Sequence, residues 1–194
     1  MDAAIIERGV FSREVHQKMI EYLDEQVPFL SVGLDDDNFT RRYIHNDSFF
    51  AHVHGQLSEF ASDRVGKKLI PSYSFLSMYD ENGVCPLHID RPQCHFTLDY
   101  LIRQSPTEAW PIYIADPMDD DQRDATDRNK HPDTAEEIEK VKASAHWNQV
   151  DLLPNDAVIY SGTNSWHYRD RLQEGTADLV FFHFVEEGFD GDLN

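Results

Sequence analysis

Two short segments of this 194-residue chain carry side chains that together could hold a metal ion. The first contains His88 and Asp90, which are separated by one residue, and the second contains His167. Because side chains alternate along a β-strand, His88 and Asp90 would point to the same face. Two imidazoles and one carboxylate are the ligands of the facial triad that binds non-haem Fe(II) and leaves coordination positions open. A lone His-x-Asp pair occurs by chance in many proteins. Whether this pair binds metal therefore has to be judged from the sequence around it.

Both segments lie in strand-like, apolar surroundings. An aromatic-rich run at 72–79 is followed by the turn residues 80–83 and by a short return into His88. Two such runs separated by Asn-Gly are typical of strand, turn and strand. Further along, residues 157–160 are apolar, and residues 178–185 form a strongly apolar last strand. Two more strands are predicted, at 96–102 and at 111–114.

The N-terminal third predicts two amphipathic helices. One is expected over residues 12–26, with Ser12 as its N-cap and apolar residues at helical spacing. A second is expected to begin at Asn46 or Asp47 and to run without a break to about residue 65. We expect both helices to pack on the outer face of one sheet.

The order of these motifs resembles that of the iron(II)/2-oxoglutarate-dependent oxygenases, and within them the small prolyl-4-hydroxylase-like enzymes. A tyrosine stands nine residues before the His-x-Asp pair, and a Pro-Asn-Asp-Ala-Val-Ile-Tyr-x-Gly segment precedes His167. The resemblance covers roughly residues 40–185. It implies a mainly β fold with flanking helices, a double-stranded β-helix (a jelly roll of the cupin-like kind) whose two sheets enclose the metal.

Carried over residue by residue, the resemblance implies that His88, Asp90 and His167 bind Fe(II) and form the catalytic centre. It implies 2-oxoglutarate as cosubstrate, O₂, and a small-molecule or peptide substrate. Tyr79 falls where related enzymes place a tyrosine against 2-oxoglutarate. The implied reaction is oxidation, by default hydroxylation, of a C–H bond in an amino acid, a peptide side chain or a natural-product intermediate.

One departure from the family pattern concerns the 2-oxoglutarate anchor. Many members carry Arg or Lys about ten residues beyond the second His, where this chain has Ala177, and no Arg or Lys follows Arg171. A buried carboxylate needs a partner. Arg169 is the expected anchor, because it shares the inward face with His167 on a regular strand and its planar fork suits a carboxylate. Other expected cosubstrate contacts are Tyr79, Ser77 and His183; expected substrate contacts are Arg91, Tyr73 and Arg171; and Arg103 is a lesser candidate for the anchor.

The composition agrees with one compact domain over residues 1–194. A chain of this length with 40% hydrophobic residues can bury its own core. No apolar run reaches membrane-spanning length, and the N-terminus lacks the pattern of a signal peptide, so we expect a cytoplasmic protein without a membrane partner. Cys85 and Cys94 are then expected to be free. A zinc site built from them with His88 and His95 matches no familiar ligand spacing.

The chain is strongly acidic, with a formal net charge of −19 from 36 acidic and 17 basic residues. Nucleic-acid affinity depends on Lys and Arg that neutralise phosphates, so a nucleic-acid partner is not expected. A cationic or neutral substrate is easier to accommodate. Acidity that only keeps the protein in solution explains the charge equally well.

Residues 116–148 form a conspicuous insertion. Its first part is rich in Asp, and Pro132 to Thr134 are expected to begin a short helix that ends near Ala145. A loop of this length in a compact domain is usually functional or disordered. Two interpretations stay open, a lid that selects substrate and a solvated surface excursion.

Two other functions also stay open. One is a cupin-type metalloenzyme that does not use 2-oxoglutarate, which the missing Arg or Lys on the last strand favours. The other is a non-catalytic jelly-roll binding protein, against which the complete set of three metal donors argues. The sequence does not identify the substrate.

Overall fold

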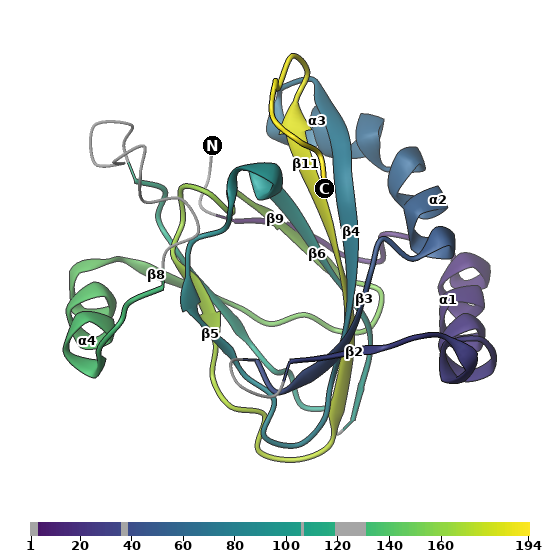
Figure 1. The fold of residues 1–194 in the computed structure, drawn as a ribbon, viewed down its shortest axis with the longest axis horizontal. Coiled ribbons are helices and arrows are strands. Elements are labelled where there is room, and N and C mark those ends of the chain that lie inside the picture. The colour runs from purple at the N-terminus through teal and green to yellow at the C-terminus, as the bar shows by residue number, and fades with distance from the viewer. Residues whose placement is uncertain (1–3, 36–38, 106, 119–130) are drawn as a thin grey trace.

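The computed structural model describes residues 4–35, 39–105, 107–118 and 131–194. Two antiparallel β-sheets face each other, and helices lie on their outer sides (Figure 1). This arrangement is a double-stranded β-helix, or jelly roll, so the predicted fold class is confirmed. The acidic residues 119–130 of the predicted insertion lie outside the described part of the chain, and the lid interpretation stays a prediction for them.

Among the described residues, the larger sheet has seven strands and the smaller sheet has four. The order in the larger sheet is β1 (Ile5–Glu7), β9 (Ala157–Tyr160), β6 (Phe96–Ser105), β11 (Thr176–Glu186), β4 (Leu69–Tyr79), β3 (Arg41–His45) and β2 (Gly33–Asp35). The order in the smaller sheet is β5 (Cys85–His88), β10 (His167–Arg169), β7 (Ile112–Ala115) and β8 (Trp147–Val150). Neighbouring strands are antiparallel in both sheets.

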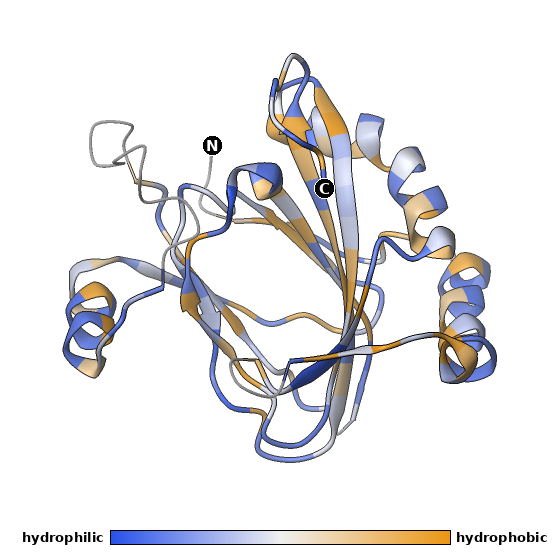
Figure 2. Ribbon diagram, viewed as in Figure 1, coloured by the Kyte–Doolittle hydropathy of each residue, from blue (hydrophilic) through white to orange (hydrophobic). Residues whose placement is uncertain are grey.

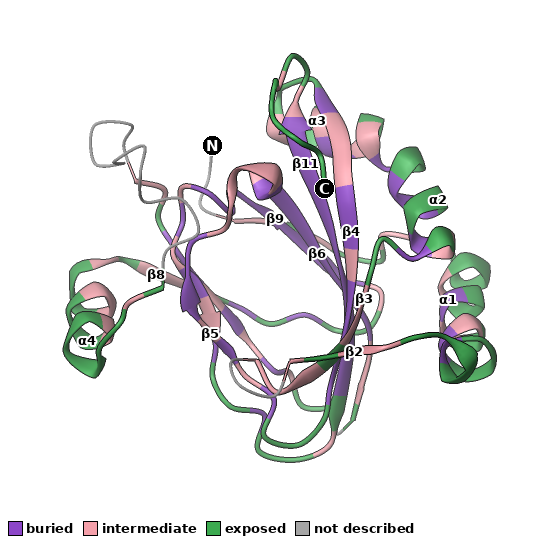
Figure 3. Cartoon of the chain, viewed as in Figure 1, coloured by how far each residue is buried: buried purple, intermediate pink, exposed green. Residues whose placement is uncertain are grey.

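The strands expected at 72–79, 96–102, 111–114, 157–160 and 178–185 correspond to β4, β6, β7, β9 and β11. The middle strands of the larger sheet are buried along most of their length, as the purple ribbons of Figure 3 show. They are apolar on both faces because helices cover one face and the smaller sheet covers the other. This double cover explains why their sequences are apolar runs and do not alternate.

Three helices, α1 (Arg13–Glu25), α2 (Ser48–Gln56) and α3 (Ser58–Val65), pack on the outer face of the larger sheet (Figure 1). The side chains of Ser12 and Asp47 cap α1 and α2 by accepting hydrogen bonds from backbone N–H groups of the first turn. The prediction of a single helix up to residue 65 is wrong, because the helix is interrupted at Leu57, between α2 and α3. There the backbone N–H bonds three residues back to His54, which tightens the turn and turns Leu57 into the core. No helix in the described ranges is long and apolar enough to cross a membrane.

The hydrophobic core has two parts, one on each face of the larger sheet. The first lies between this sheet and the helices and includes Met19 of α1, Phe50 of α2 and Phe182 of β11. The second lies between the two sheets and includes Ile112 and Leu179. Figure 2 shows hydrophobic residues along β9, β6 and β11, between more hydrophilic loops.

The C-terminal part of the predicted insertion folds beside the smaller sheet. Helix α4 (Ala135–Ser144) begins with a capping box in which Thr134 and Glu137 bond each other's backbone N–H groups, so the predicted short helix is confirmed. No residue of α4 is buried. Strand β8 begins at Trp147, which pairs with Ala115 of β7, within one residue of the predicted end of the insertion.

Candidate metal centre

The structure brings the three predicted metal donors together at one point between the sheets. Strands β5 and β10 are neighbours in the smaller sheet, and His167 lies opposite His88. Asp90 lies two residues beyond His88, the last residue of β5. Its Oδ1 lies 3.3 Å from Nε2 of His88 and 3.7 Å from Nε2 of His167, and the three donor atoms lie within 4.8 Å of one another.

Both imidazoles are oriented by backbone carbonyl groups. Nδ1 of His88 lies 2.7 Å from the carbonyl oxygen of Pro86, and Nδ1 of His167 lies 3.0 Å from that of Ser165. A carbonyl oxygen can only accept, so each Nδ1 carries the hydrogen and donates it. In metal sites this second interaction fixes the ring, and here Nε2 of each ring faces Asp90.

The carboxylate of Asp90 is held in place from the side opposite the imidazoles. Its Oδ2 accepts a hydrogen bond from the Thr97 hydroxyl at 3.3 Å, and its backbone N–H donates to Gly162 at 2.8 Å. A Cβ atom at Gly162 would overlap Oδ2 of Asp90 and the carbonyl oxygen of Cys94. Position 162 therefore has to be glycine for the carboxylate to keep this place, a role that was not predicted from the sequence.

The pKa values of the three donors are shifted from their ordinary values by burial and by one another. Burial and, to a smaller extent, the neighbouring His88 together lower the pKa of His167 to about 4. Burial would also lower the pKa of His88, but Cys85 and Asp90 outweigh it and raise the value to about 10. Burial would raise the pKa of Asp90, but the two imidazoles hold it below its ordinary value. A metal ion that binds here must displace the proton of His88, as is usual for histidine ligands.

A cavity of about 60 Å³ adjoins the three donors. Two residues expected to bind the cosubstrate, Arg169 and His183, contribute to its wall, so both point inward as predicted for Arg169. The full lining consists of Cys85, His88, Asp90, Asp99, Ile112, Tyr160, His167, Arg169, Phe181 and His183.

The guanidinium of Arg169 is already paired inside this cavity. It donates to Oδ2 of Asp99 at 2.6 Å and to the carbonyl oxygen of Trp110 at 2.5 Å, and both charged side chains are buried. Burial raises the pKa of Asp99, and Arg169 opposes the increase. The sequence analysis missed Asp99. The available signal was an acidic residue in the middle of an otherwise apolar run, on the same strand face as Thr97.

A second arginine reaches the interior, and the sequence analysis missed it because it did not predict β3. Arg41 donates to the hydroxyl groups of Ser77 at 3.0 Å and Tyr79 at 3.2 Å, two residues that were expected to bind the cosubstrate. Its side chain is 12% exposed and lies 3.7 Å from a carboxylate oxygen of Asp35. Its Nε has no hydrogen-bond partner among the described residues. Phe39 covers the guanidinium, 3.9 Å from the ring centre.

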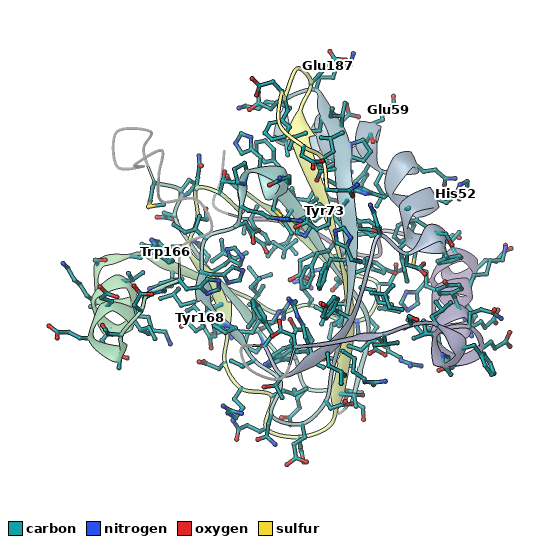
Figure 4. The ribbon with its side chains drawn as sticks, viewed as in Figure 1. His52, Glu59, Tyr73, Trp166, Tyr168 and Glu187 are labelled. Carbon is teal, nitrogen blue, oxygen red and sulfur yellow. The ribbon has the colours of Figure 1, made fainter. Side chains whose placement is uncertain are left out.

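The three expected substrate-binding residues occupy two different places. Arg91 and Tyr73 lie together, because Nε of Arg91 donates to the Tyr73 hydroxyl at 3.0 Å and the guanidinium covers the ring. The ring of Tyr73 packs against His183, and Figure 4 shows Tyr73 within the body of the molecule. Arg171 instead donates to the carbonyl oxygen of Asn82 on the surface, and the structure does not bring it to the cavity.

The described end of the insertion returns to the metal donors. The ring of His131 stacks on that of His88, with centres 5.2 Å apart and planes 8° apart. Phe39 meets the same His88 ring edge-on at 5.6 Å. Burial lowers the pKa of His131. Two segments far apart in the sequence thus flank one of the candidate ligands.

Comparison with known proteins finds similarity of fold and not of sequence. No family model and no curated protein matches the chain. Among solved structures it is similar to the non-haem alpha ketoglutarate dependent carbocyclase SnoK from nogalamycin biosynthesis, with a TM-score of 0.75 and 11% identity over 95% of this chain and 80% of that one. It is also similar to HygX from Streptomyces hygroscopicus with nickel and 2-oxoglutarate bound, with a TM-score of 0.65 and 14% identity over 97% of this chain and 84% of that one. For EctD from S. alaskensis with bound Fe, the TM-score is 0.67 and the identity is 11% over 95% of this chain and 73% of that one.

The donor set fits a divalent first-row transition ion. Two imidazoles with their Nδ1 hydrogens engaged and one ionised carboxylate make a complete facial set, and each ligand is oriented by a second group. Such a set would occupy one side of the ion and leave coordination positions open. The three donors line a cavity that offers space beside them.

Proposed function

We propose that this protein is a non-haem iron(II) oxygenase that uses 2-oxoglutarate and O₂ to oxidise, by hydroxylation, a C–H bond of a small molecule or a peptide. The observation that carries the proposal is the cluster of His88, Asp90 and His167 at a cavity between the two sheets of a jelly roll. The structural neighbours support it, because iron, nickel or 2-oxoglutarate is named with several of them.

The residues divide into ligands and residues that orient them. His88, Asp90 and His167 would hold Fe(II), which together with 2-oxoglutarate supplies the activation of O₂ for C–H oxidation. Pro86 and Ser165 fix the imidazole rings through their carbonyl groups. Both imidazoles are buried, which limits the access of water to that side of the metal site.

For the distal carboxylate of 2-oxoglutarate, Arg41 is a better partner than the expected Arg169. A carboxylate beside Arg169 would also meet Asp99, so two buried negative charges would share one guanidinium. Arg41 has its Nε–H unused, and the hydroxyl groups of Ser77 and Tyr79 accept its hydrogen bonds and keep their own hydrogens to donate. These three donors together suit an incoming carboxylate.

The strand register supports the same placement. Ala177, which stands where many similar enzymes carry Arg or Lys, lies opposite Tyr79 in the ladder between β11 and β4. Arg41 lies opposite Tyr79 on its other side, in the ladder between β3 and β4. Arg41 of β3 would thus supply the basic side chain that β11 lacks at Ala177. Both residues lie level with Tyr79 in the sheet, and β3 is two strands away from β11.

Metal binding tests the centre itself. An anaerobic Fe(II) titration followed by calorimetry should show tight binding to the parent protein and its loss in His88→Ala, Asp90→Ala and His167→Ala, because two remaining ligands no longer define a face. The matched control is His52→Ala, since His52 lies exposed on α2 (Figure 4) and should leave the affinity unchanged. Full iron binding by the His167→Ala protein would remove the proposal.

The anchor is tested by 2-oxoglutarate binding to the iron-loaded protein. Arg41→Ala should raise the Kd at least about tenfold, about 1.4 kcal/mol, and Arg41→Lys should recover only part of the loss, because a point charge cannot replace the fork. Arg42→Ala is the matched control, since this neighbouring residue is exposed and pairs with Asp80. If Arg169→Ala weakens binding and Arg41→Ala does not, Arg169 is the anchor.

A metalloenzyme of the cupin type without 2-oxoglutarate is the second candidate. The observation that favours it is the ion pair of Arg169 and Asp99, because the arginine that lines the cavity already has a carboxylate partner. This candidate becomes the better one if the parent protein binds iron tightly and 2-oxoglutarate is neither bound nor consumed. A protein that binds neither would fit the jelly-roll binding module instead.

A further inference from the structure

A second set of metal-binding side chains adjoins the candidate iron ligands. Donor atoms of Asp90, Cys94 and His183 lie within 4.8 Å of one another. Cys94 is 2% exposed and His183 is 6% exposed, so both are interior residues. They come from the 3₁₀ turn η2 (Pro92–Cys94) and from β11, which the fold packs against each other beside Asp90.

The two oxygens of the Asp90 carboxylate face different neighbours. Oδ1 is the atom nearest to the imidazoles of His88 and His167. Oδ2 instead accepts from the Thr97 hydroxyl, and the same hydroxyl lies 3.0 Å from Nδ1 of His183. One carboxylate therefore has an oxygen available to each set of donors.

The hydrogen bonds of Thr97 prepare His183 as a ligand. The Thr97 hydroxyl has one hydrogen and gives it to Asp90, so its oxygen accepts a hydrogen from Nδ1 of His183. In this tautomer Nε2 carries the free lone pair that a metal requires.

The hydrogen bonds of Tyr73 hold Cys94 in place beside Asp90 and His183. Nε of Arg91 can only donate, so the oxygen of Tyr73 accepts from it at 3.0 Å. The same hydroxyl group is hydrogen-bonded to Sγ of Cys94, 2.9 Å away, and when Cys94 is a thiolate the hydroxyl hydrogen of Tyr73 is the one donated. Burial and the carboxylate of Asp90 raise the pKa of the Cys94 thiol, and the Tyr73 hydroxyl and the positive charge of Arg91 oppose the increase. A metal ion that binds Cys94 must therefore displace the thiol proton, as is usual for cysteine ligands.

We propose that Cys94, His183 and Oδ2 of Asp90 form a binding site for a thiophilic divalent cation such as Zn²⁺. Thiolate, imidazole and carboxylate are the three ligand types of zinc, and three protein ligands leave its fourth position open. The carboxylate of Asp90 would then bridge this ion and the ion held by His88 and His167. The site goes beyond the proposed oxygenase function and requires neither 2-oxoglutarate nor a substrate.

Cobalt(II) distinguishes the two sites, because cobalt bound to thiolate shows a sulfur-to-metal charge-transfer band that cobalt on imidazole and carboxylate lacks. The parent protein should bind about two Co²⁺ per chain and show the thiolate band. Cys94→Ser should lose the band and one of the two ions. Cys85→Ser is the control for the origin of the band, since Cys85 is the other buried cysteine of the described chain, and this variant should keep the thiolate band. Because Cys85 lines the first cavity, only the band and not the affinity of the first site is read from it.

His167→Ala separates this inference from the proposed function. It should lose the ion at the first site and keep the thiolate band of the second. The inference is overturned if the parent protein binds one ion without a thiolate band, a result that needs no variant to fold. It is equally overturned if Cys85→Ser removes the band and Cys94→Ser, shown to be folded by circular dichroism, retains it.

Discussion

The larger sheet is covered on its outer face by α1, α2 and α3, and the main hydrophobic core lies between that face and the helices. The smaller sheet contributes both candidate histidine ligands, on β5 and β10, and its neighbouring helix α4 has no buried residue. Tyr168, on the side of β10 away from His167, contacts Tyr113, Trp147 and the ammonium group of Lys142 of α4.

Because of this difference, we expect side chains in the two regions to affect two different quantities, the free energy of unfolding and the affinity for metal. A side chain in the helix-covered core acts on the free energy of unfolding, because its contacts are apolar and close-packed. A side chain near the smaller sheet's donors acts on metal affinity, because it sets the place of an oxygen or a nitrogen atom. Substitutions in the two regions should therefore have effects that can be measured independently.

The largest effect on stability is expected at Phe182, on the helix side of β11. Its side chain is fully buried, and its ring packs against those of Phe50 and His54. Phe182→Ala should lower the free energy of unfolding by about 3–5 kcal/mol, measured by urea denaturation, and leave Fe(II) affinity unchanged under conditions where the variant is folded.

Phe29→Ala provides the control, since Phe29 is 87% exposed. Its effect on unfolding should stay within about 0.5 kcal/mol. A large loss of iron affinity in folded Phe182→Ala protein would show that the two regions are not independent.

The next largest effect depends on pH and concerns His54 of α2, which packs against Phe182 and Phe184. Burial lowers its pKa from 6.5 to about 4. As the pH falls below 6.5, the unfolded chain therefore takes up this proton before the folded protein does, and stability is lost between about pH 6.5 and 4. The loss amounts to about 3 kcal/mol, and stability is regained as the pH rises.

His167 and His183 have lowered pKa values as well and also contribute to the pH dependence of stability. The contribution of His54 is therefore measured as the difference between the parent protein and a His54 variant. Urea denaturation of metal-free protein from pH 7 to pH 4 should show a smaller decrease for His54→Leu than for the parent. Identical pH profiles for the two proteins would mean that His54 does not titrate as its burial predicts.

The smallest of these effects tests the region of the donors. In Gly162→Ala the new Cβ would overlap Oδ2 of Asp90, so the carboxylate has to move. Fe(II) affinity should fall about 10- to 100-fold, as for other residues that orient a ligand. Calorimetry gives the affinity, and urea denaturation should show a much smaller change than Phe182→Ala. Unchanged iron affinity would mean that Oδ2 can be displaced without consequence for the metal.

Much of this molecule follows from local sequence patterns. Strands β4, β6, β7, β9 and β11, the cap residues Ser12 and Asp47, and the placing of His88 and Asp90 on one side of the chain depend on spacings of a few residues. Such spacings are governed by the backbone periods of helix and strand, which are the same in every protein. His167 is more distant in sequence, and its assignment needed the resemblance to a family.

Other parts of the site were decided only when the chain was folded. Arg41 reaches Tyr79 because β3 and β4 are neighbours, Asp99 meets Arg169 across the space between the two sheets, and Gly162 touches Asp90 through a turn. Each of these contacts joins residues 38 or more positions apart. Strand order and register fix them, and these depend on how two sheets bury their apolar faces against each other, a property of the whole chain that no single segment encodes.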